Sequence, residues 1–99
     1  MKFKKYHRKY PDTEWDYKAI STFVDGKEII YYVLKSHGED SSGVEIYGGR
    51  NYVVGSSDRA YSRTYLLDRV PPKYKKVVLL LMKKHSKTKW SNKSYVNVN

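Results

Sequence analysis

The chain of 99 residues has the length of one domain whose core is modest for its surface. It contains no cysteine, which excludes disulfides and cysteine-ligated zinc or redox centres, while its 15% aromatic residues argue against a disordered chain. Its formal net charge of +10 indicates a partner rich in phosphate or carboxylate, and its longest apolar run, residues 77–82, is too short to span a bilayer.

The positive charge lies at both ends of the chain. Residues 1–10 hold five basic residues and no acid, and residues 69–99 hold nine basic residues and no acid. All ten acids lie between these segments and outnumber the six basic residues there. We interpret residues 1–10 as a basic arm, residues 11–86 as the folded core and residues 87–99 as a polar, basic tail of a single domain.

The clearest local pattern is a hairpin around Asp25-Gly26, a pair that suits the positive φ angles of a type I′ turn. In a two-residue turn Val24 faces Lys27, and cross-strand partners share a face. One face then carries Ile20, Thr22, Ile29, Tyr31 and Val33, and the other carries Tyr17, Ala19, Phe23, Ile30, Tyr32 and Leu34. Because both faces are largely apolar, we expect the hairpin to be covered on both sides, by helices or by a second copy.

A second, weaker hairpin follows a polar segment. Residues 36–43 show no periodicity, so we predict a loop and the most mobile part of the chain. Residues 44–47 and 50–54 then form two short strands around Gly48-Gly49. One face of this hairpin carries Val44, Ile46 and Val53, and the other carries Glu45, Tyr47, Arg50 and Tyr52.

Two helices are predicted in the C-terminal third. Residues 58–69 follow serine cap candidates and place Ala60, Tyr61, Thr64 and Leu67 on one side. Pro71-Pro72 ends this helix, and Pro72 suits the first position of a second one that reaches about Ser86. Its apolar stripe consists of Tyr74, Val77, Val78, Leu81 and Met82. Residues 77–82 also fit a buried strand, but the leucines and the proline favour a helix.

Taken together, these elements predict an α+β fold. An antiparallel sheet of about four strands, arranged as two hairpins, is packed by one or two C-terminal helices.

The basic ends are the candidate nucleic-acid-binding site. Lysine and arginine neutralise phosphates and release counterions, and aromatic residues between them can stack on bases. The alternative is that the lysines serve solubility and the aromatic residues form the core. The predicted phosphate contacts are Lys2, Lys4, Lys5, Arg8, Lys9, Lys73, Lys76, Lys83, Lys84 and Lys87, and the interleaved aromatic residues are Phe3, Tyr6, Tyr10, Tyr74, Trp90 and Tyr95.

Leu79 and Leu80 fall on the lysine-rich side of the second helix. An apolar spot within a polar rim is typical of a contact surface, so we predict that both leucines lie at an interface with a partner or a second copy. A helix packed between two layers is the alternative. Exposure of the leucines among the lysines would favour a protein partner, whereas burial below a clean lysine stripe would favour nucleic acid.

No catalytic or metal-binding motif is visible. The three histidines, His7, His37 and His85, lie far apart and form no HxH or HExxH spacing. His37 with Glu39 and Asp40 groups possible ligands, but a solvated loop explains them equally well. There is no nucleophile elbow and no phosphate-binding glycine loop. We therefore expect no enzymatic activity, no cofactor and no metal.

Three segments carry a resemblance to a group of viral proteins: the start MKFKKYHRKY, the strand EIIYYVLK and the segment VPPKYKKVVLLLMKKH, in a chain that lacks both cysteine and glutamine. The chain resembles the short, lysine- and tyrosine-rich proteins of filamentous and rod-shaped viruses of hyperthermophilic archaea (lipothrixviruses and rudiviruses). The resemblance implies a thermostable small fold that works in the cytoplasm of the host cell or in the virion. It implies no catalytic residues.

The leading hypothesis is a non-enzymatic module that binds the nucleic-acid backbone with weak sequence specificity. The rival hypothesis is a protein–protein interaction factor, such as a viral effector that binds a host protein or a homodimeric structural protein.

Overall fold

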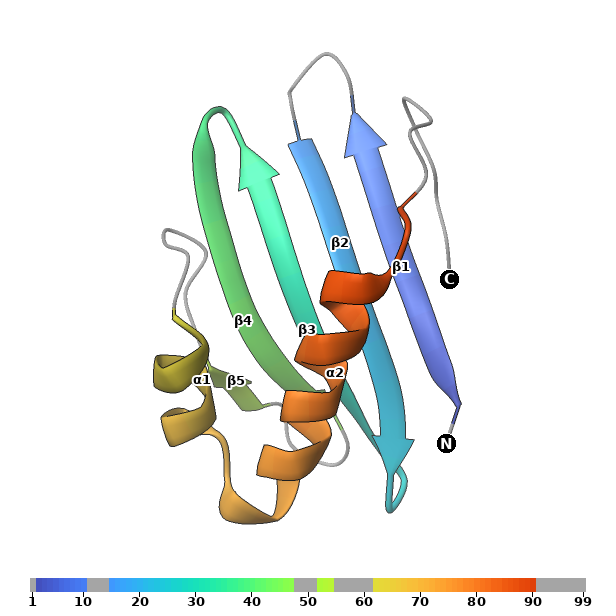
Figure 1. Cartoon of the computed structure of the whole chain (residues 1–99), viewed down its shortest axis with the longest axis vertical. Helices are drawn as coiled ribbons and strands as arrows, with labels where there is room; N and C mark the ends of the chain where they lie inside the picture. Colours follow the sequence, from blue (N-terminus) through green and yellow to red (C-terminus); the bar gives the residue numbers. More distant parts are fainter. Residues whose placement is uncertain (1, 11–14, 48–51, 55–61, 91–99) are drawn as a thin grey trace.

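The strands of the sheet follow one another in space as they do in sequence. The computed structural model describes residues 2–10, 15–47, 52–54 and 62–90. Each neighbouring pair of strands is antiparallel (Figure 1). The five strands are β1 (Phe3–Tyr10), β2 (Trp15–Val24), β3 (Lys27–Ser36), β4 (Glu39–Tyr47) and β5 (Tyr52–Val54).

Two tight turns with left-handed backbone set the long hairpins. Asp25 and Gly26 have φ angles of 51° and 77° and join β2 to β3, as the sequence predicts. His37 and Gly38 have φ angles of 51° and 78° and join β3 to β4 in the same way. Positive φ at both central residues suits the right-handed twist of paired strands. Val24 lies opposite Lys27, so the predicted register is confirmed.

The C-terminal part forms the helices, which confirms the α+β class. Ser62 has an extended backbone and its hydroxyl accepts from the Tyr65 N–H at 3.1 Å, so α1 (Arg63–Arg69) begins there and not at residue 58. Within α1 itself Leu66 is buried and Thr64 is exposed, while the predicted Ala60 and Tyr61 lie outside the described residues. A 3₁₀ turn, η2 (Pro72–Tyr74), leads into α2 (Lys75–Lys87), so the second helix is confirmed over the strand alternative.

The main core lies between the helices and one face of the sheet (Figure 1). Figure 1 shows α1 and α2 on the same side, with α2 crossing β2 and β3. The predicted stripe of α2 supplies most of the helical half of this core, with Val77 at its margin. The core residues are Ile20, Ile29, Val44, Ile46, Leu66, Val70, Tyr74, Val78, Leu81 and Met82.

The opposite face of the sheet, the open face, has no described helix or strand above it. Its buried residues are Ala19, Ile30 and Tyr32, and around them pack Tyr6, Tyr17, Leu34 and Tyr47. The division of side chains between the two faces follows the prediction from the hairpin. We expected both faces to be covered. In the described part of the chain this prediction is wrong, because both helices lie on one side of the sheet.

The first ten residues do not form an arm outside the core. Residues Phe3–Tyr10 pair along their whole length with β2, from Phe3 opposite Thr22 to Tyr10 opposite Trp15. The pattern FKKYHRKY lacks the apolar alternation of a buried strand, so the sequence gives little sign of it. Backbone hydrogen bonds to β2 hold this segment, and the Thr22 hydroxyl adds one to the Lys2 carbonyl at 2.6 Å.

The polar loop predicted for residues 36–43 is also wrong. Only His37 and Gly38 form the turn, and β4 then continues from Glu39, with Ser41 and Ser42 buried. The predicted pairing of the next two strands is confirmed, but its register differs by one residue. Val44 lies opposite Val54, which places Val53 opposite Glu45. The predicted Gly48-Gly49 turn and the tail beyond residue 90 lie outside the described residues.

Candidate functional site

Strand β1 divides the N-terminal basic residues between the two faces of the sheet. Successive side chains of a strand point to opposite sides. Phe3 packs on the helix-covered core, so Lys5, His7 and Lys9 share that side. Tyr6 packs in the open-face cluster, so Lys4 and Arg8 share the other side.

The C-terminal half of α2 lies beside β1. The Lys84 ammonium lies 4.5 Å from the centre of the Phe3 ring, and the rings of His7 and Trp90 meet edge to face at 5.7 Å. Lys5 stands between Phe3 and His7 on the same side of the strand. The fold therefore brings together two basic segments that are about eighty positions apart in the chain.

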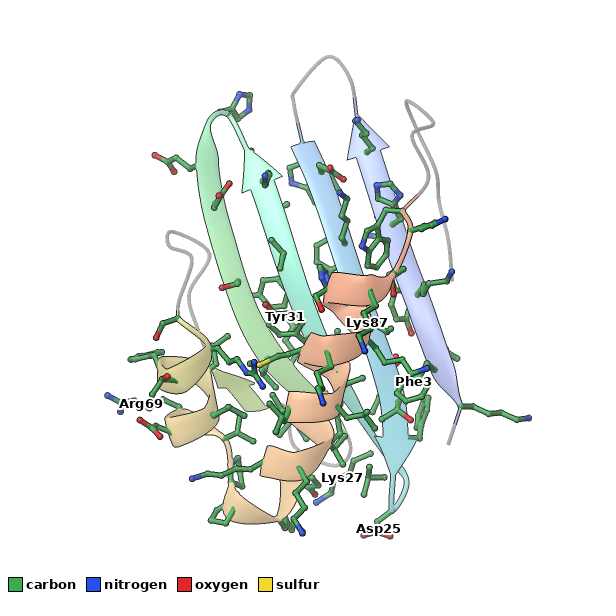
Figure 2. The ribbon with its side chains drawn as sticks, viewed as in Figure 1. Phe3, Asp25, Lys27, Tyr31, Arg69 and Lys87 are labelled. Carbon is green, nitrogen blue, oxygen red and sulfur yellow. The ribbon has the colours of Figure 1, made fainter. Side chains whose placement is uncertain are left out.

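A pocket of ≈ 380 Å³ opens on this side of the molecule. Figure 2 shows Lys87 on α2 and Phe3 on β1 on the same side of the sheet. Leu80 is 37% exposed at the pocket, whereas Leu79 is half-buried. The pocket is lined by Leu80, Lys83, Lys84, Lys87 and Thr88. We name Lys5, Lys83, Lys84 and Lys87 the helix-side basic surface.

The lysines of this surface have no carboxylate partner among the described residues. The nearby carboxylate of Asp16 is bonded elsewhere: it accepts a hydrogen bond from His7 Nε2 at 2.9 Å and lies 3.6 Å from the Lys18 ammonium. The lysines do lie near the C-terminus of α2, where a positive charge favours the helix dipole. The Ser86 and Thr88 hydroxyls already donate to two of the last carbonyls, those of Lys83 and Lys84. The surface therefore keeps its positive charge available to an external anion.

The ten predicted phosphate contacts do not form one surface. Lys73 lies in η2, before α2, with its ammonium 5.0 Å from the centre of the Tyr74 ring, and the Lys27 ammonium approaches the same ring at 5.9 Å. Lys2 and Lys76 are exposed, and Lys9 is half-buried. On the open face, the Lys4 ammonium lies 5.4 Å from the centre of the Phe23 ring. Four of the ten therefore belong to the helix-side basic surface, and Lys4 and Arg8 belong to the open face.

The open face carries a row of aromatic rings that sequence reasoning did not identify as a site. Trp15 and Tyr17 stack with ring centres 5.9 Å apart and an angle of 14°. Tyr17 and Tyr32 continue the row at 5.9 Å and 23°. Trp15 and Tyr17 lie two positions apart on a strand and therefore share a face, and this spacing is the sequence signal that could have predicted the row. The aromatic residues that were predicted to stack on bases mostly lie elsewhere. Among those whose side chains the structure describes, only Tyr6 is on the open face. Phe3 and Tyr74 pack with the core, and Trp90 lies between His7 and His85.

Two carboxylates on the open face accept hydrogen bonds from neighbouring hydroxyls. Glu28 Oε2 accepts from the Tyr6 hydroxyl at 2.5 Å and from the Ser21 hydroxyl at 2.8 Å. Glu45 Oε2 accepts from the Tyr47 hydroxyl. That hydrogen bond, together with burial, raises the pKa of Tyr47 to about 12. Burial, then the bond to Glu28, raises the pKa of Tyr6. These tyrosines stay protonated near neutral pH and are donors there, which makes them poor nucleophiles.

A second pocket, of ≈ 280 Å³, lies at the β1 side of this aromatic row. Its walls are aromatic and aliphatic, and its polar groups are a guanidinium and a carboxylate. The lining residues are Tyr6, Arg8, Trp15, Tyr17, Glu28 and Ile30. An apolar hollow with a few polar groups is the usual form of a ligand site.

His7 and His85 pack on Trp90, whereas His37 lies in the turn between β3 and β4. His85 lies 5.0 Å from the Trp90 ring centre, and its Nε2 donates to the Lys18 carbonyl at 3.1 Å. His7 is buried, and its Nδ1 has no hydrogen-bond partner among the described atoms. No group of three or more His, Asp and Glu side chains in the described ranges could hold a metal ion. No described helix is long and apolar enough to cross a membrane.

Comparison with known proteins adds no family to this description. No protein-family model, no curated protein and no solved structure matches the chain.

Proposed function

We propose that the protein is a non-enzymatic module that binds the phosphate backbone of nucleic acids through its helix-side basic surface. The observation that carries the proposal is the meeting of β1 and α2. Lys5 comes from a segment without acids, Lys83, Lys84 and Lys87 come from another, and none of them has a carboxylate partner among the described residues. A phosphate chain supplies the missing negative charges.

Counterion release is the main source of affinity in this proposal. Each neutralised phosphate of duplex DNA contributes about 0.9 to the slope of log affinity against log salt concentration. The four lysines of the surface therefore predict a slope of about −3 to −4. Contacts to phosphates carry no base information, so sequence preference at this surface should be weak.

A salt titration with charge-reversal variants tests the proposal. The double variant Lys83→Glu/Lys87→Glu should bind duplex DNA at least about tenfold more weakly at low salt and show a shallower slope, because two phosphate contacts are lost. Lys84 is kept in this variant because it packs on Phe3. Measurement is by fluorescence anisotropy of a labelled duplex.

The matched control compares two single changes of equal charge. Lys87→Glu alters the basic surface, whereas Lys35→Glu alters an exposed lysine at the end of β3, outside the pocket. Equal losses from both variants would contradict the proposal, since net charge alone would then explain the binding.

A protein partner with an acidic surface is the second candidate, and the exposure of Leu80 favours it. By the criterion set from the sequence, an exposed leucine among lysines points to protein contact. One leucine is, however, a small part of the about 800 Å² that each partner usually buries. Leu80→Ser should leave oligonucleotide binding unchanged under the first candidate. Under the second, it should weaken self-association or partner capture.

The viral origin, the thermostability and the location in the host cytoplasm or the virion remain predictions from the sequence.

A further inference from the structure

The open face presents apolar surface that no described helix or strand covers. Trp15 and Tyr17 are half-buried, and beside them lie Ile30 and the pocket of ≈ 280 Å³. In a chain with 30% charged residues, a hollow in which three of the six lining residues are aromatic stands apart from the rest of the surface. Continuous apolar surface with polar groups at its border marks a binding site.

The border of this hollow is positively charged. Arg8 lines the pocket, and Lys4 lies on the same side of β1, four residues earlier. β1 is an edge of the described sheet, so Arg8 flanks the aromatic row on one side, whereas the Lys4 ammonium lies over the Phe23 ring, farther along the strand. A guanidinium offers five donors in a planar fork that matches phosphate oxygens.

The pocket also provides hydrogen-bond acceptors beside its aromatic walls. Glu28 Oε2 already receives the Tyr6 and Ser21 hydroxyls. A carboxylate has about four acceptor positions, so Glu28 retains capacity for an N–H group of a ligand. Flat apolar walls, a cation at the edge and a spare acceptor match the chemistry of a nucleotide, with its planar base, its N–H groups and its phosphate.

A second copy of this chain is a poorer match for the same face. Each copy has a formal charge of +10, and a face-to-face pair would bring two sets of Lys4 and Arg8 to one interface. Like charges across an interface oppose association. An anionic occupant gains from the same residues.

We propose that the open face binds unpaired bases of single-stranded nucleic acid. A base enters the pocket beside Tyr6, Trp15 and Tyr17, and the adjoining phosphates lie on Arg8 and Lys4. The inference rests on the proposed function and narrows it to strands whose bases are accessible. Side chains of β1 alternate between the faces, so one strand can pass around this edge from Arg8 and Lys4 to Lys5 and the helix-side basic surface.

The experiment compares strands that share a backbone and differ in their bases. The probes are oligo(dT), an abasic oligodeoxynucleotide of equal length and a duplex of equal length, at one salt concentration. Oligo(dT) should bind about tenfold more tightly than the abasic strand for each stacked base. In a Trp90→Phe background Trp15 is the only tryptophan, and its emission should be quenched by oligo(dT) but not by the abasic strand.

Variants separate the pocket from the rest of the surface. Trp15→Leu should remove most of the difference between oligo(dT) and the abasic strand. Arg8→Ala should weaken oligo(dT) binding and leave duplex binding unchanged, because the duplex offers no unpaired base to the open face. Tyr65→Leu is the matched control, because Tyr65 is an exposed aromatic residue of α1, on the covered side of the sheet. Arg8 is exposed, so its variant tests the pocket even if Trp15→Leu fails to fold.

Each outcome has a defined meaning. Equal binding of both strands with unchanged Trp15 emission overturns the inference and leaves backbone binding intact. No binding of any probe at low salt overturns the proposed function and this inference with it. Trp15 emission that shifts with protein concentration alone, with a dimer seen by sedimentation, shows that a second copy occupies the face and overturns the inference.

Discussion

The two faces of the sheet are built by the same strands, yet they differ in chemistry. The helix-covered face is aliphatic, with Ile20, Ile29 and Val44 buried against α2 and its neighbours. The open face is aromatic and carries carboxylates that accept tyrosine and serine hydroxyls. Tyrosine and tryptophan combine an apolar ring with a polar group, so they suit a face that remains in contact with water. The comparison shows that an apolar pattern on both sides of a hairpin does not require a helix on both sides.

The largest expected difference between the faces is in packing. Leu81 is 0% exposed between α2 and the sheet, so Leu81→Ala should lower the free energy of unfolding by about 2–5 kcal/mol. Ile30→Ala on the open face should cost less, because Ile30 borders a pocket that solvent can enter. Urea unfolding measures the free energy of unfolding of both variants. Equal losses would mean that the open face is covered in solution, which would break the comparison.

Hydrogen bonding on the open face provides the next effect. Glu28→Ala removes the acceptor of the Ser21 hydroxyl, which is 0% exposed, and should destabilise by about 1–3 kcal/mol because a buried donor is left unsatisfied. Glu45→Ala removes the partner of Tyr47, a half-buried residue whose hydroxyl can turn to water. This variant should lower the free energy of unfolding by about 0.5–1.5 kcal/mol. A larger loss for Glu45→Ala would contradict the assigned network.

Acid should weaken the helix-covered side selectively. Burial lowers the pKa of His85, partly offset by its hydrogen bond to the Lys18 carbonyl. Below pH 6.5 the unfolded chain therefore binds more protons at this position than the folded chain. Stability is unaffected above that pH and falls as pH drops from 6.5 towards the lower folded pKa. Tyr31 and Trp90 are the other rings that contact His85.

The test of this smallest effect is urea unfolding at pH 7.5 and pH 5.5. His85→Gln should lose less stability between the two conditions than the unchanged protein, since glutamine can donate to the Lys18 carbonyl without titrating. Trp90 emission should respond to the acid before Trp15 emission, because Trp90 contacts His85. An unchanged pH dependence in His85→Gln would rule out His85 as its source.

Much of the fold was predictable where a local signal sufficed. Asp25-Gly26 defined its hairpin and register, and the proline start with the apolar stripe defined α2. The beginning of α1 was missed because three serines compete as caps, at positions 56, 57 and 62, and the true cap lacks a glutamate three residues later.

The candidate site was predictable only as a set of residue types. The lysines of α2 were identified correctly as an exposed group, but their meeting with β1 depends on contacts such as Lys84 with Phe3. The aromatic row combines Trp15 and Tyr17 with Tyr32 from the next strand. The spacing of residues along the sequence does not indicate on which side of the sheet the helices will pack.

By itself the sequence determined the periodicities: the alternation on β2 and β3, the stripe on α2 and the placement of charge at the ends. Tertiary structure decided which segments paired and which face was covered. The lysines of β1 and the serines at the start of β4 have weak strand preference, and pairing with their neighbours overrode it. The packing of α2 on β2 and β3 is the long-range event, because its free energy comes from groups distant in the chain. Local patterns therefore set the two faces, and long-range packing chose the one that remains open.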